Sequence, residues 1–212
     1  PDDIAIVGLG GTGSQLARSV ARILYDRKHK GQHVPRLTFI DPDIVQGHNV
    51  GRQMYTWQDA QSGVYKAAVL AQRFNAALGL EIVWVTEPLD SERHLRHGSL
   101  VLGCVDNHVA RAEIARKEGC LWIDCGNHFD SGQVIIGNTG ARQQALDSLR
   151  NSRDGTCRYL PHAGLLFPAL LEPEPEEEKD ETMSCAELVA AGEQHLLVND
   201  LMGIVAAQYV SK

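Results

Sequence analysis

Short apolar runs alternate with stretches of helical periodicity through about residue 137. Apolar runs that end at glycine or at polar residues predict buried strands, as at residues 4–7. From Ser14 onward, apolar residues recur at the three- to four-residue spacing of a helix. The basic and polar stretch 26–32 is predicted to be a loop. The expected strands span 4–7, 37–40, 81–85, 100–102, 121–123 and 133–136, and the later expected helices span 65–78 and 109–117.

This alternation predicts an α/β protein, because strands separated by helices form parallel sheets. We expect a Rossmann-like fold, with a mostly parallel sheet, helices on both faces, an antiparallel extension and a C-terminal helix near 196–209. The length suits a single domain, 1–212. Within it, 151–184 is predicted to be an irregular, crossover-like segment that includes an acidic run at 172–181. A capping-box pattern at Ser184-Cys185-Ala186-Glu187 predicts the start of a helix.

Charge and composition exclude several classes of protein. The net charge is −7, and the acidic run contributes −6 of it (seven acidic residues and one lysine), so the rest of the chain is near −1. Such a balance does not support a nucleic-acid surface, which needs a basic patch. No run of eighteen apolar residues or signal peptide is found, so we expect no membrane span and a cytoplasmic location. Five cysteines, an odd number, favour reduced thiols.

A glycine-rich turn lies between the first expected strand and the first expected helix. Its glycines are Gly8, Gly10, Gly11 and Gly13. Glycines at such a turn let the backbone approach a phosphate chain, and the N-terminus of the helix favours negative charge. The motif alone indicates a nucleotide without identifying it, and a glycine turn with no ligand stays open.

Polar residues after later strands narrow the choice of nucleotide. Asp41, in Asp41-Pro42-Asp43, follows the second strand, where a carboxylate can bind ribose hydroxyls of either a dinucleotide or ATP. Arg and Lys side chains suit a triphosphate better than a nicotinamide cofactor, because they neutralise phosphate charge. Asp106 follows the fourth strand, where it faces the same edge of the sheet and can hold a magnesium ion. The remaining polar candidates are Asn49, Arg52, Gln53 and Lys66.

Taken together, these residues resemble the signature of the ThiF/MoeB family, which is related to ubiquitin-activating enzymes. The resemblance covers about residues 3 to 137 and resumes near Cys185. The later part is also similar to the ThiF-family proteins of PRTRC plasmid systems. That looser resemblance rests on Leu165-Leu166-Phe167-Pro168, Ser184-Cys185 and Gln194-His195-Leu196-Leu197-Val198-Asn199.

The resemblance implies an ATP-dependent adenylyltransferase with Mg²⁺. Its substrate would be the C-terminal glycine carboxylate of a small ubiquitin-like protein, and the enzyme would be a homodimer. By carry-over, Asp41 would hold ribose, Asp106 would coordinate magnesium, and Asn49, Arg52 and Lys66 would contact phosphates. The alternatives are adenylation of a small-molecule or tRNA-borne carboxylate, and a non-catalytic binding module on the same fold.

Two departures from the family pattern concern zinc and an N-terminal arginine. Many relatives have paired Cys-x-x-Cys motifs, and none occurs here, so we expect no structural zinc site. Many relatives also supply an arginine from a segment before the first strand, and we expect it to be missing from this sequence. In relatives with a thiol-transfer step, a cysteine lies near the position of Cys185, which is therefore the candidate thiol, with Cys157 the weaker one.

Overall fold

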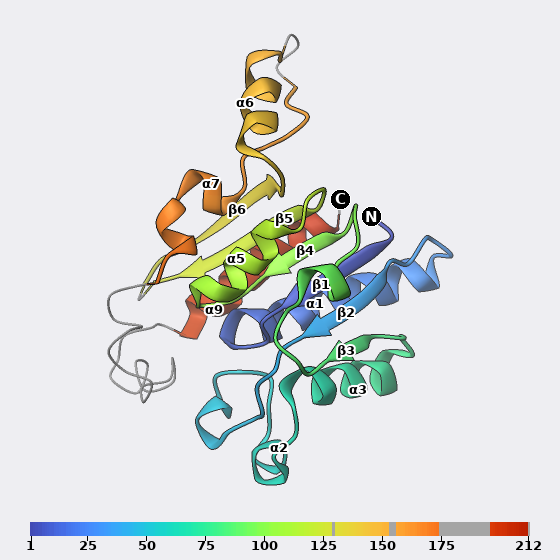
Figure 1. The fold of residues 1–212 in the computed structure, drawn as a ribbon. Helices are drawn as coiled ribbons and strands as arrows, with labels where there is room; N and C mark the ends of the chain where they lie inside the picture. Colours follow the sequence, from blue (N-terminus) through green and yellow to red (C-terminus); the bar gives the residue numbers. More distant parts are fainter. Residues whose placement is uncertain (129, 153–155, 174–195, 212) are drawn as a thin grey trace.

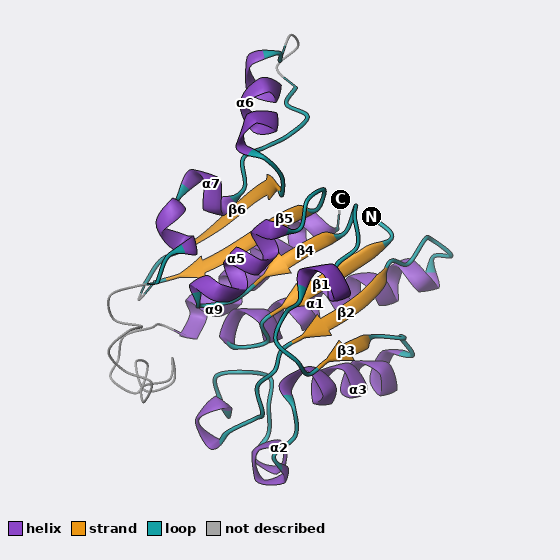
Figure 2. Cartoon of the chain, viewed as in Figure 1, coloured by secondary structure: helices purple, strands orange, loops and turns teal. Residues whose placement is uncertain are grey.

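The computed structural model describes residues 1–128, 130–152, 156–173 and 196–211, and their centre is one six-stranded sheet (Figures 1 and 2). The strand order is β3-β2-β1-β4-β5-β6. The pairs from β3 to β5 are parallel, whereas β6 runs antiparallel to β5. The strands are β1 Asp3–Val7, β2 Arg36–Ile40, β3 Val83–Val85, β4 Leu100–Gly103, β5 Leu121–Asn127 and β6 Gly132–Asn138.

Helices cover both faces of this sheet (Figure 2). The α-helices are α1 Gly11–His29, α2 Trp57–Ser62, α3 Lys66–Leu78, α4 Ser91–His94, α5 His108–Arg116, α6 Arg142–Arg150, α7 Ala163–Leu166 and α9 Leu196–Val210. Two 3₁₀ helices are η1 Gly47–Asn49 and η2 Pro168–Leu171. On one face, α1, α3 and α9 pack against Ile6, Phe39 and Ile123; on the other, α5 and α7 pack against Val101 and Trp122. The predicted fold class is therefore confirmed.

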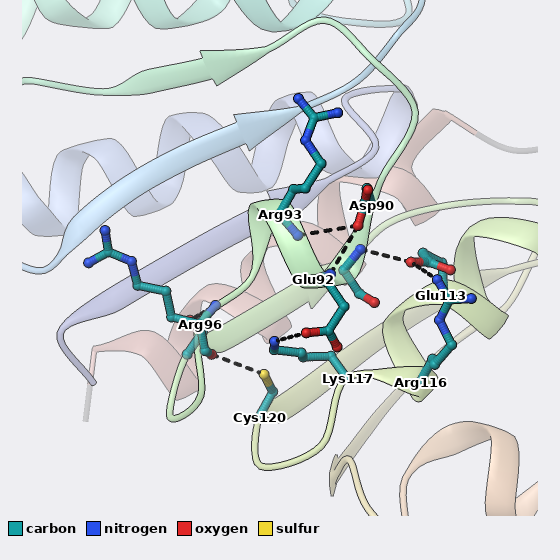
Figure 3. Close-up of polar contacts among 10 residues, drawn as sticks. Asp90, Glu92, Arg93, Arg96, Glu113, Arg116, Lys117 and Cys120 are labelled. Carbon is teal, nitrogen blue, oxygen red and sulfur yellow. Dashed lines mark hydrogen bonds and ion pairs between the residues drawn. The ribbon is translucent and has the colours of Figure 1, made fainter.

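A polar network fastens α5 to the segment that leads into β4 (Figure 3). The backbone N–H of Ser91 in α4 donates to Glu113 Oε1 at 2.8 Å, and Lys117 Nζ lies 2.8 Å from Glu92 Oε2. Burial alone raises the pKa of Glu113, but hydrogen bonds from Ser91 and Arg116 hold it below its ordinary value. These contacts fix the helix that follows the predicted magnesium ligand.

Several boundaries differ from the sequence prediction. The predicted loop at 26–32 was wrong in its first half, because α1 continues to His29. The extra turn is supported by the Lys30–Asp26 ion pair and by the Tyr25 ring against His29, and its basic side chains suit the helix C-terminus. The sequence also missed α2, α4 and α6. The start of α2 is marked by a capping box, in which the side chains of Thr56 and Asp59 each accept the backbone N–H of the other residue.

The C-terminal helix is present as α9, in agreement with the predicted span 196–209. The capping-box residues and most of the acidic run lie outside the described residues, so the predicted helix start at Ser184 stays a prediction. The described part of the crossover-like segment contains α7 and η2. In the part of the chain that the structure covers, no helix is both long and apolar enough to cross a membrane.

Candidate functional site

The strand order reverses between β1 and β4, and ligands of open α/β sheets bind at the carboxyl ends of strands at such a switch point. The glycine turn follows β1 there, beside the end of β4. Gly8 has φ +83°, and a Cβ on it would lie 2.6 Å from the carbonyl oxygen of Cys104. Any larger residue would push the two strand ends apart, so this glycine is required by the fold itself.

The other glycines of the turn have different environments. A Cβ on Gly13 would collide with the carbonyl of Gly8, and one on Gly11 would lie 2.7 Å from Asn199 Nδ2. Gly10 is the N-cap of α1, and among the described residues no atom beyond its two chain neighbours lies within 4 Å of such a Cβ. Within the described part of the chain, Gly10 is therefore the glycine of this turn that faces open space, where a ligand can approach the backbone.

Asp41 joins the glycine turn to the loop after β2. Its Oδ2 accepts the backbone N–H of Leu9 at 2.6 Å, and its Oδ1 accepts the N–H of Asp43 at 2.8 Å. The side chain is buried, and burial raises its pKa, while the positive charge of Lys66 acts in the opposite direction. Two backbone bonds leave further lone pairs on the carboxylate, so Asp41 keeps acceptor capacity for a ligand.

Lys66 begins α3 and forms an ion pair with Asp43, with Nζ and Oδ2 2.7 Å apart. Its side chain is 9% exposed, whereas that of Asp43 is 63% exposed. The ammonium is therefore the buried partner of this pair, and the carboxylate is the exposed one. The structure thus brings Asp41 and Asp43, which follow β2, together with Lys66 at the start of α3, as the sequence predicted for the start of that helix.

Three further candidate residues, Asn49, Arg52 and Gln53, lie between Asp43 and Lys66, at the end of η1 and in the loop that leads to α2. Asn49 is buried, and its Oδ1 accepts the backbone N–H of Gln46 at 2.8 Å, so part of this side chain caps η1. Arg52 is half-buried. The Oε1 atom of Gln53 is buried without a hydrogen-bond donor in the described structure. Because buried acceptors are nearly always paired, this orphan atom is an indication that a donor-bearing ligand or water binds here.

Asp106 is exposed at the carboxyl end of β4, next to the N-cap of α5. The cap is Asn107, whose Oδ1 accepts the N–H of Ala110 at 2.9 Å. Within the described residues, no group of three His, Cys, Asp or Glu side chains could hold a metal ion by itself. Magnesium differs from such sites, since it is often bound by one or two carboxylates together with substrate phosphates.

Two side chains to which the sequence pattern gave no role, Tyr55 and Asn199, hold the glycine turn in place. The buried hydroxyl of Tyr55 donates to the carbonyl of Leu9 at 2.8 Å, and burial, together with the charge of Asp41, raises its pKa well above the ordinary value. On the other side of the turn, Asn199 of α9 accepts the hydroxyl of Thr12 at 3.0 Å. Tyr55 is the one aromatic residue in the mostly polar segment 49–56, and this isolated position was the sequence signal that it is buried.

The described cysteines differ in burial. Cys120 and Cys125 are buried in the hydrophobic cores, whereas Cys104, which packs against the same core as Cys125, is half-buried. Cys157 is half-buried, and its Sγ donates to the carbonyl of Tyr159 at 3.0 Å. Cys185, the candidate thiol, lies outside the described residues.

The sheet order and the helices on both faces define an α/β protein of the Rossmann-like class, with a glycine turn at its switch point. A comparison with protein families matches residues 2–206 to the ThiF family, so the chain belongs to that family. No curated protein matches the sequence.

Solved structures of two E. coli proteins share the fold. MccB with ATP is 14% identical, with a TM-score of 0.59, over 100% of this chain and 54% of MccB. The structure of MccB with MccA is 14% identical, with a TM-score of 0.55, over 100% of this chain and 55% of MccB. The tRNA N6-threonylcarbamoyladenosine dehydratase TcdA, in complex with ATP, is 22% identical, with a TM-score of 0.57, over 99% of this chain and 84% of TcdA. The chain thus spans about half the length of MccB.

Proposed function

We propose that this protein uses ATP to adenylate a carboxylate. The observation that carries the proposal is the gathering of Asp41, Asp43 and Lys66 beside the open face of Gly10, at the switch point of a ThiF-family sheet. Two structural neighbours contain ATP, which supports the choice of nucleotide. In the reaction, a carboxylate oxygen bonds to the α-phosphorus of ATP, and pyrophosphate leaves with the electrons of the broken P–O bond.

The residues present fit ATP and Mg²⁺. Gly10 leaves room for phosphates, and the orphan Oε1 of Gln53 can accept a hydrogen from the nucleotide. Asp41 would bind ribose hydroxyls. Asn49, Arg52 and Lys66 would contact phosphates, with Gly8, Gly11 and Gly13 shaping the turn around them. A magnesium ion bound by Asp106 would neutralise phosphate charge. Positioning and charge neutralisation then suffice for the first step, without a protein nucleophile.

For the substrate, we favour the C-terminal glycine of a small ubiquitin-like protein. The family supports this choice, and the MccB structure with MccA gives an example of a neighbour with a further bound partner. The other candidate is a small-molecule or tRNA-borne carboxylate, which the similarity to a tRNA-modifying dehydratase favours. A third alternative is a non-catalytic binding module on the same fold. The presence of all the polar residues expected of the enzyme, from Asp41 to Asp106, argues against it.

Further parts of the proposal concern partners and a second step. We infer a homodimer, a cytoplasmic location and kinship with the PRTRC-system proteins. Cys185 would accept the activated acyl group as a thioester, with AMP as the leaving group. In that step the thiolate attacks the acyl carbon of the adenylate, so the cysteine is needed only after adenylation.

Exchange of ³²P between pyrophosphate and ATP tests the proposal. Exchange that requires a small protein ending in diglycine supports the ubiquitin-like substrate, and exchange with a small acid or with tRNA supports the alternative. Calorimetry provides the binding control. Binding of NAD without any binding of ATP-Mg would refute the assignment.

A further inference from the structure

The C-terminal helix contacts the glycine turn through one buried amide. Asn199 is 4% exposed, and its Oδ1 accepts two hydrogen bonds. One comes from the hydroxyl of Thr12 at 3.0 Å, and the other from Asn127 Nδ2 at 2.6 Å. Asn127 Nδ2 also donates to Thr12 Oγ1. Three elements, α1, β5 and α9, therefore meet at one polar triad of Thr12, Asn127 and Asn199.

The backbone of the turn is fitted to this amide. A Cβ on Gly11 would lie 2.7 Å from Asn199 Nδ2, so a glycine is what lets the amide reach this position. One helical turn later in α9, Gly203 approaches the backbone of α1, where its Cβ would lie 3.1 Å from Leu16 N and 3.3 Å from Thr12 O. Asn199 and Gly203 thus share the face of α9 that contacts the first turns of α1.

Stability alone does not require this arrangement. A buried polar triad contributes little net stability, because each group gives up its hydrogen bonds to water, and apolar replacements of matching shape are often neutral. Directional bonds do, however, fix a backbone in one orientation. Here they hold Gly11 and Thr12 toward α9, while Gly10, between Gly11 and Leu9, faces open space.

We propose that Asn199 is a positioning residue for the nucleotide. Through Thr12 and Gly11 it holds the glycine turn so that Gly10 is presented to the phosphates of ATP. This inference rests on the proposed function, namely that the glycine turn binds ATP. It adds that affinity for ATP depends on a residue 187 positions away from Thr12 in the sequence.

The test measures ATP-Mg binding by calorimetry, together with the melting temperature, for the wild type, Asn199→Ala and Val198→Ala. Val198, the neighbouring buried residue of α9, is the matched control for loss of packing. We expect Asn199→Ala to weaken ATP binding about tenfold, in line with the loss of a hydrogen bond in a fixed site. Val198→Ala should lower the melting temperature and leave the affinity unchanged, since a merely structural role would not alter the Kd well below that temperature.

If Asn199→Ala does not fold, Thr12→Val removes the same hydrogen bond with little change of volume, and the same weakening is expected. A double-mutant cycle adds a second criterion. Gly11→Ala should weaken ATP binding in the wild type, because its methyl group displaces the amide, and should add no further loss in Asn199→Ala.

Each outcome decides a separate point. Wild-type protein that does not bind ATP would overturn the proposed function itself. Wild-type protein that binds ATP, with Asn199→Ala and Thr12→Val binding equally well, would overturn only the role of Asn199. Equal losses from Gly11→Ala in both backgrounds would also overturn it, because Gly11 would then act on the ligand without Asn199.

Discussion

Removing Arg111 should destabilise the protein in a strongly pH-dependent way. Arg111 of α5 lies over Asp124 of β5, with Nε and Oδ1 3.4 Å apart, and the two side chains are 11% and 1% exposed. The other oxygen of Asp124, Oδ2, is buried without a hydrogen-bond partner in the described structure. In Arg111→Leu the carboxylate would be left buried with no counter-charge. Breaking a buried pair in this way typically costs about 3–5 kcal/mol.

The long contact distance places the expected loss near the lower end, at about 3 kcal/mol, or roughly 6–12 °C in melting temperature for a chain of this size. Burial raises the pKa of Asp124 above 3.8, and Arg111 opposes this shift. A carboxyl whose folded pKa is raised stabilises the fold below its unfolded pKa, and this stability is lost as the pH rises through the folded pKa. Without Arg111 the folded pKa of Asp124 rises further, so the deficit should be small near pH 4 and complete at pH 7.5.

Urea denaturation of the wild type and Arg111→Leu at several pH values measures this difference. Asp124→Asn is the control, because it removes the carboxylate whose protonation produces the pH dependence. Its deficit should vary little with pH, because no carboxylate is left at position 124 to titrate. A deficit in Arg111→Leu that is the same at pH 4.5 and pH 7.5 would refute the reasoning and attribute the loss to packing alone.

Two further predictions concern the surroundings of the glycine turn. Tyr55→Phe removes the hydroxyl that donates to the carbonyl of Leu9, and we expect a loss of about 1–2 kcal/mol in urea denaturation; an unchanged midpoint would contradict it. The hydrogen bond with Cys125 and burial raise the pKa of the Cys104 thiol well above its ordinary value. Cys104 should therefore resist iodoacetamide at pH 8 until the protein is unfolded, as mass spectrometry can show, and rapid labelling of folded protein would count against this.

Much of the fold follows from the sequence because of how parallel sheets are buried. Strands covered on both faces are continuous apolar runs, and β1 and β4 are clear examples. Short helices have no such signal, since α4 covers four residues and is defined by the cap of Asp90. Helix α6 follows Gly140, where the apolar pattern weakens, and only one of its residues, Ala145, is buried.

The candidate site also has a part that the sequence predicts and a part that it does not. Residues that follow strands, such as Asp41 and Asp106, could be placed at one edge of the sheet from the strand pattern alone. Contacts between segments far apart in the sequence could not be predicted in this way. Tyr55 contacts Leu9 across 46 positions, and Asn199 contacts Thr12 across 187. No local period or motif encodes such pairs, because they depend on how helices and loops pack after the sheet has formed.

Asp106→Ala distinguishes a ligand-binding carboxylate from a structural one. Asp106 is exposed and follows β4 without lying in either hydrophobic core, so its loss should change the unfolding free energy by less than about 0.5 kcal/mol. Loss of a metal-binding carboxylate, in contrast, removes several kcal/mol of charge stabilisation, and pyrophosphate exchange should fall at least about 100-fold.

Asp147→Ala is the matched control for this substitution, because it removes the same charge from the exposed surface of α6. Both variants should have wild-type melting temperatures, whereas only Asp106→Ala should lose exchange. Exchange by folded Asp106→Ala at the level of Asp147→Ala would place the magnesium ligand elsewhere.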